Sequence, residues 1–196
     1  DEMVNQSQHS AAAAAKMGNK VFEYMALGYQ AIAHSQRGNH KDALTVVAQR
    51  SALKAELGGG PIIMDDIFGA LISEVLANAG EFDQAAGLAT AILQIAEKIG
   101  NPTSEAIARR TLGRVCAQRS EWAESDTHMS RAVELLEGNI SPPELARTRT
   151  LWGAALHQRG DLNGAKSQWT HAAELFEKHG LKAELAAVQQ RLARII

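Results

Sequence analysis

The segment LHQRGDLNGA, residues 156–165, joins two helical patterns through a glycine, and it has three counterparts in the chain. The counterparts are HSQRGNHKDA at 34–43, LANAGEFDQA at 76–85 and CAQRSEWAES at 116–125. The central residues of the four segments stand 42, 40 and 40 positions apart: Gly38, Gly80, Ser120 and Gly160. A constant spacing of this size indicates a repeat protein, in which one structural unit is stacked several times.

Two further columns of small residues keep the same spacing. The column before the elbow consists of Ala31, Ser73, Gly113, Gly153 and Ala193. The column after it consists of Ala43, Ala85, Ser125 and Ala165. Small side chains let two helix backbones approach closely, so we expect these columns where the two helices of a hairpin meet. Glycine at the elbow suits a helix end that is followed by left-handed backbone.

Between the elbows, apolar residues recur at helical spacing, as at Leu185, Val188 and Leu192, and no alternating strand pattern of useful length competes. We predict ten helices, at about 4–17, 20–37, 40–57, 62–79, 82–99, 103–119, 121–137, 143–159, 162–179 and 181–195. The predicted fold class is all-α, a right-handed α–α superhelix of antiparallel hairpins.

The expected domain organisation follows from the same columns. Residues 1–18 are predicted to be the second helix of a preceding repeat that the chain truncates. Residues 19–196 form the repeat domain, with units at about 19–59, 60–100, 101–140 and 141–180 and a cap helix at 181–196. The chain opens at Asp1 without a methionine, which we interpret as a cut from a longer protein.

Composition narrows the class of protein. The net charge of −2 does not point to nucleic acid or to an anionic membrane. The single cysteine, Cys116, excludes an internal disulfide and fits a reducing compartment. No apolar run approaches the roughly 20 residues of a membrane span. We therefore expect a soluble, cytoplasmic protein that binds neither membranes nor nucleic acid.

The third and fourth units carry glycine, aromatic and alanine residues at regular places. The third has Leu112, Gly113, Ser120, Trp122, Ser125, Met129 and Ala132. The fourth has Trp152, Gly153, Gly160, Leu162, Ala165, Trp169 and Ala172. This pattern resembles the tetratricopeptide repeat family, whose usual unit has about 34 residues. Units of 40–42 residues are similar to the repeat arrays of bacterial multidomain regulators. The resemblance implies a protein–protein interaction module of a larger signalling or transcription-regulating protein.

Features that suggest chemistry have simpler explanations. Gly58–Gly60 lacks the Lys-Ser/Thr that follows a phosphate loop, so a joint between repeats is expected. Asp65 and Asp66 suit the first turn of a helix, where acids interact favourably with the helix dipole. The seven histidines lack the spacing of a zinc site. We expect no enzyme, no metal and no cofactor.

Charge is distributed unevenly among the predicted helices. Those at 103–119, 143–159 and 181–195 are basic, whereas 121–137 holds five acids against one arginine. The resemblance implies that first helices line the concave groove. The residues predicted to contact an acidic partner segment there are Arg110, Arg114, Arg147, Gln190 and Arg194. Alternatively, these arginines are solvated or paired with neighbouring glutamates.

Other functions remain open at this point. The chain could be a regulatory domain that binds a small effector. It could also self-associate through its end helices and form a homodimer, with the alanine run at 11–15 packed on another copy. An enzyme with histidines in a helical-repeat active site is a distant third.

Overall fold

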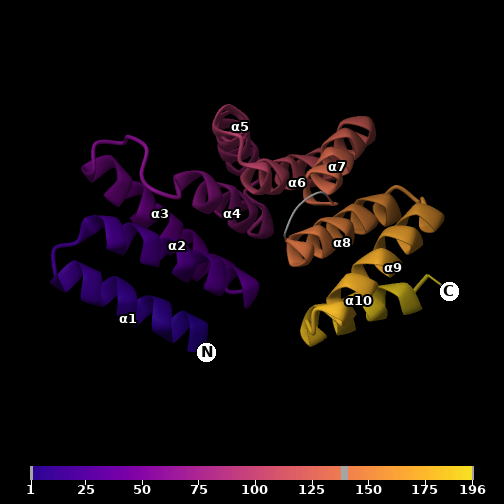
Figure 1. The fold of residues 1–196 in the computed structure, drawn as a ribbon, viewed down its shortest axis with the longest axis horizontal. Helices are drawn as coiled ribbons and strands as arrows, with labels where there is room; N and C mark the ends of the chain where they lie inside the picture. Colours follow the sequence, from indigo (N-terminus) through magenta and orange to yellow (C-terminus); the bar gives the residue numbers. More distant parts are fainter. Residues whose placement is uncertain (1, 138–140, 196) are drawn as a thin grey trace. The chain divides into compact units, whose positions relative to one another are not determined.

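The computed structural model describes residues 2–137 and 141–195, and its regular structure there is entirely helical (Figure 1). The helices of these residues are α1 Glu2–Lys16, α2 Lys20–Gln36, α3 His40–Glu56, α4 Asp65–Asn78, α5 Phe82–Ile99, α6 Pro102–Gln118, α7 Trp122–Glu137, α8 Pro142–Gln158, α9 Leu162–Lys178 and α10 Lys182–Ala193. All ten predicted helices are present, and their ends lie within about three residues of the predicted ends. The all-α hairpin architecture is confirmed. The predicted boundaries at 1, 140 and 196 lie outside the described residues.

The helices form two compact units, which divide inside α5, between Leu88 and Ala89. In the first unit α2 packs against α1, α3 and α4, and α3 also contacts α4. In the second unit α6 contacts α7 and α8, α7 contacts α8, α8 contacts α9, and α9 contacts α10. Helices α1 and α2, on either side of the repeat boundary predicted at residue 18, pack together within the first unit, and the predicted repeat boundaries stay predictions.

Helix ends are set by a few residue types. The side chains of Asn19, Asn101 and Asp161 accept hydrogen bonds from backbone N–H groups of the first turns of α2, α6 and α9. Pro102 and Pro142 begin α6 and α8, where a missing N–H costs nothing. Glycine at the elbows adopts left-handed backbone, with φ of +77° at Gly38, +87° at Gly80 and +90° at Gly160. These local signals explain why the helix ends could be predicted closely.

Ser120 occupies the elbow position that glycine holds in the other three units, with φ of +61°. Left-handed backbone destabilises the folded state by about 1–2 kcal/mol for a residue with a side chain. Glycine avoids this strain, but its greater conformational freedom in the unfolded state offsets part of the stabilisation. Ser120→Gly is therefore expected to raise the free energy of unfolding by about 0.5–1 kcal/mol, measured by urea unfolding. Gly160→Ser is the reciprocal control and should lower it. A Ser120→Gly variant less stable than the parent would contradict this explanation of the elbow.

The small-residue columns lie where helices approach each other, as predicted. A Cβ added to Gly113 would lie 3.1 Å from the backbone oxygen of Ser125, and one added to Gly153 would lie 2.5 Å from the indole of Trp169. The side chains of the second column are fully buried: Ala43, Ala85, Ser125 and Ala165. Ala193, in contrast, is exposed. The close approach of α6 to α7 and of α8 to α9 therefore requires glycine.

The core of the second unit's last hairpin is built around Trp169. This side chain is buried with Leu156, Phe176 and Val188, and its indole N–H donates to the backbone oxygen of Thr150 at 3.0 Å. Trp152 on α8 is partly buried against this cluster. Its indole N–H donates to Asp126 at 2.9 Å. Both tryptophans thus serve packing between helices.

Candidate functional site

Arginine and glutamate side chains connect α6, α8 and α10 of the second unit. The guanidinium of Arg110 on α6 lies 2.8 Å from a carboxylate oxygen of Glu144 on α8. Arg147, one turn further along α8, pairs with Glu144 as well, and it lies 3.4 Å from Glu184 on α10. The surface formed by these three helices is called the α6–α8–α10 surface below.

Arg110 is an internal contact of this surface. It is 1% exposed, and it also donates to the backbone oxygen of Glu144 and to Thr148 Oγ1, at 3.2 Å each. Burial alone would raise the pKa of Glu144, but the charges of Arg110 and Arg147 lower it below its ordinary value. A partner segment has no access to the Arg110 guanidinium, so we leave Arg110 out of the surface proposed below.

The other predicted contact residues lie at more accessible places. Arg114 is half-buried on α6, one turn after Arg110. The Arg147 side chain is 39% exposed despite its two ion pairs. Gln190 and Arg194 are exposed on α10 and at its carboxyl end. The structure thus brings Arg110 and Arg147 together at Glu144, and Gln190 and Arg194 together on α10.

Arg191 is a further candidate that the sequence prediction did not select. It lies three residues before Arg194, on the last turn of α10. Among residues 2–137 and 141–195, no acidic side chain is within ion-pair distance of Arg191 or Arg194. Partial burial, and then the like charge of Arg194, lower the pKa of Arg191. An anion placed beside this pair would be stabilised by both charges.

A second ionic cluster holds α2, α3 and α4 of the first unit together. The hydroxyl of Tyr24 donates to Asp65 at 2.5 Å, and Arg50 and Lys54 also pair with this carboxylate. The Arg50 guanidinium lies 3.8 Å from the centre of the Tyr24 ring and is almost fully buried. Burial alone would raise the pKa of Asp65, but hydrogen bonds from Lys54 and Tyr24 lower it. The sequence assigned Asp65 to the helix dipole alone, whereas it also anchors three helices.

Cys116 is a weak candidate for a reactive nucleophile. Burial and a hydrogen bond to Glu121 raise the pKa of the half-buried Cys116 thiol to about 11, which leaves little reactive thiolate at neutral pH.

Within residues 2–137 and 141–195, no group of three His, Cys, Asp or Glu side chains is placed to hold a metal ion. None of the helices in these ranges is both long and apolar enough to span a bilayer.

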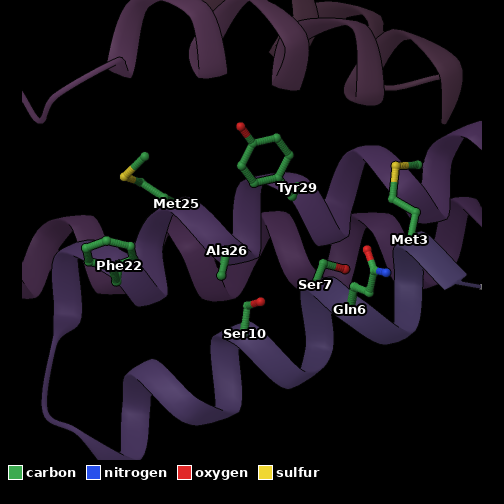
Figure 2. A pocket seen from close by; sticks show the side chains of 8 residues that line it. All are labelled: Met3, Gln6, Ser7, Ser10, Phe22, Met25, Ala26 and Tyr29. Atoms are coloured by element: carbon green, nitrogen blue, oxygen red, sulfur yellow. The ribbon is translucent and has the colours of Figure 1, made fainter.

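An apolar hollow of about 350 Å³ lies between α1 and α2 of the first unit (Figure 2). Its lining residues are Met3, Gln6, Ser7, Ser10, Phe22, Met25, Ala26 and Tyr29. Three of its large side chains are well exposed, namely Phe22 at 64%, Tyr29 at 50% and Met3 at 47%. The sequence prediction missed this hollow, whose apolar lining comes mainly from α2, because α1 contributes only Met3 beside three polar residues.

Comparisons with known proteins give a fold but no family. No family model matches the chain, and no curated protein matches it. Among solved structures, BtubC (BKLC) from P. vanneervenii has 14% sequence identity and a TM-score of 0.63. The match covers 99% of this chain and 89% of that one. At this identity the similarity shows the helical-repeat fold alone.

Proposed function

We propose that this chain is a protein–protein interaction module whose α6–α8–α10 surface binds an acidic segment of a partner. The observation that carries the proposal is the pair Arg191 and Arg194, two cations on one helix end without an acidic neighbour among the described residues. The similarity of 40–42-residue units to the repeat arrays of bacterial regulators supports a place in a larger signalling or transcription-regulating protein.

The distribution of charge on the surface favours α10 as the anchoring point. Arg110 and Arg147 share Glu144 and Glu184, so two cations are balanced there by two acids. Arg191 and Arg194 are not balanced in this way. Guanidinium groups bind carboxylates through two parallel hydrogen bonds, which suits recognition of Asp and Glu side chains. Exposed Gln190 adds an amide that can donate to the same segment.

The proposal is tested by titrating the chain with a fluorescent oligoglutamate peptide and recording anisotropy. We expect Arg191→Gln with Arg194→Gln to weaken binding about tenfold or more, since a charge-assisted hydrogen bond contributes roughly 1.5–3 kcal/mol. The matched control is Arg131→Gln, which removes an exposed arginine of α7 that pairs with Glu134. It should change the affinity less than about twofold, because an exposed charge outside the α6–α8–α10 surface is screened by salt.

Three outcomes would contradict the proposal. The parent chain could fail to bind the peptide at low salt, where surface charges act most strongly. The Arg131 variant could lose as much affinity as the α10 variant, which would indicate unspecific attraction. A single-stranded oligonucleotide of equal charge could bind more tightly than the peptide, which would favour a nucleic acid partner instead.

A further inference from the structure

Glu184 on α10 holds Arg147 of the α6–α8–α10 surface only loosely. Its carboxylate oxygen lies 3.4 Å from Nη2 of Arg147, whereas the buried pair of Arg110 and Glu144 is at 2.8 Å. Charge-assisted hydrogen bonds of this kind usually measure about 2.7–2.9 Å. The contact between Arg147 and Glu184 is therefore a long and weak hydrogen bond.

The two acids that pair with Arg147 differ in how easily another carboxylate can replace them. Glu144 accepts from Nη1 of Arg147, is mostly buried, and is also held by Arg110. The side chain of Glu184 is 36% exposed. Because surface ion pairs contribute little free energy, an exposed glutamate can turn to water at low cost. The Nη2 group of Arg147 is therefore accessible to an acid of a partner.

Arg147 and the pair Arg191 and Arg194 form two separate cationic positions along α10. Glu184, which lies beside Arg147, precedes Arg191 by seven positions. Seven positions make two turns, or about 10 Å, and return to the same face of the helix. A peptide in the polyproline II conformation advances about 9 Å in three residues and also returns to the same side. Two acids three residues apart can therefore reach both positions.

We propose that Glu184 is a built-in competitor for the second acid of the partner, so that the surface binds segments with two acids about 10 Å apart. The first acid binds Arg191 and Arg194, and the second takes the place of Glu184 at Arg147. A segment with one acid is held at the end of α10 alone. This inference rests on the proposed function, because it specifies the partner of the same surface.

The competition is tested with two peptides, one with glutamates three residues apart and one with glutamine in place of the second glutamate. Each is titrated into the isotope-labelled chain, and the amide shifts of α10 give the affinity. Glu184→Gln should bind the two-acid peptide about three to five times more tightly than the parent, because Arg147 is no longer occupied by a carboxylate. The affinity for the one-acid peptide should change less than about 1.5-fold in 0.15 M salt, which screens charges more than about 8 Å apart.

The matched control is Glu134→Gln. It also removes one exposed acid from a pair with an arginine, but on α7, outside the surface. Neither peptide should change its affinity by more than about 1.5-fold. Glu184→Ala is a second variant in case glutamine loosens α10, because alanine has the higher helix propensity. It should bind the two-acid peptide as tightly as Glu184→Gln does.

Arg147→Gln separates competition from simple charge repulsion. If Glu184 competes for Arg147, adding Glu184→Gln to an Arg147→Gln chain should change the affinity for the two-acid peptide less than about 1.5-fold. If Glu184 only repels the peptide, its removal should strengthen binding at least as much without Arg147 as with it.

Two results would overturn the inference and leave the proposed function intact. The first is an equal increase in affinity with and without Arg147. The second is a parent chain that binds the two-acid peptide as tightly as both Glu184 variants do. If neither the parent nor the Glu184 variants bind an acidic peptide, the proposed function and this inference fail together.

Discussion

Glu144→Gln is expected to lower the free energy of unfolding by about 3–5 kcal/mol, because it removes the charge of a carboxylate that pairs with a buried guanidinium. Arg110 is 1% exposed and has Glu144 as its ion-pair partner on α8. Urea unfolding of the parent and the variant, followed by circular dichroism, measures the difference. Glu134→Gln removes an exposed acid that pairs with Arg131 on one face of α7. That control should cost less than about 1 kcal/mol.

The same carboxylate should give the stability a dependence on pH. The folded-state pKa of Glu144 lies below the ordinary value of 4.5. The contribution of the Glu144 carboxylate to the free energy of unfolding is therefore fully present above pH 4.5, and it is lost as the pH falls through the folded-state pKa. The Glu144→Gln variant should lack this part of the acid destabilisation. If Glu144→Gln lowers the free energy of unfolding by less than about 1 kcal/mol at neutral pH, the ion pair with Glu144 is not what stabilises the buried Arg110.

Gly153→Ala is expected to lower the free energy of unfolding by about 2–3 kcal/mol, because α8 and α9 meet at this glycine. The added methyl group would lie 2.5 Å from two ring atoms of Trp169, a side chain that the surrounding core holds in place. Thermal unfolding of the parent and the variant gives the comparison. The expected shift is a lower melting temperature with helical content retained.

Gly87→Ala is a matched control for the same substitution. Gly87 lies within α5, and a Cβ added there would meet no atom within 4 Å. The free energy of unfolding of this variant should be about 0.5–1 kcal/mol higher than that of the parent, because alanine loses less chain entropy than glycine when a helix forms. The two Gly→Ala changes should therefore have opposite signs. Equal effects would contradict the assignment of Gly153 to a close helix contact.

The hairpin architecture was predictable because its determinants are local and repeated. An elbow such as Gly160 and a contact residue such as Gly153 recur every 40–42 positions. Gly160 adopts left-handed backbone, and Gly153 lies directly against Trp169 of the next helix. Asn101 and Pro102 mark a helix start through hydrogen bonding and a fixed backbone angle. A single sequence contains these signals without reference to the rest of the fold.

The pairing of charged side chains was not predictable to the same degree. Arg110 was expected on an open groove, but it reaches Glu144, 34 residues later, and is buried by that contact. Net charge per helix does not show which cation faces which acid. Arg191 was counted with the charge of its helix, and only the structure reveals that no described acid approaches it. Long-range geometry decides such pairs, and helical periodicity does not encode it.

The most direct test of the proposed function is to map where an acidic peptide binds. An isotope-labelled chain is titrated with oligoglutamate while the backbone amide signals are followed by NMR. We predict the largest shifts in α10, around Gln190 and Arg194, with smaller shifts near Arg147 on α8. At saturation, shifts confined to helices outside the α6–α8–α10 surface, or no shifts at all, would contradict the proposed binding surface.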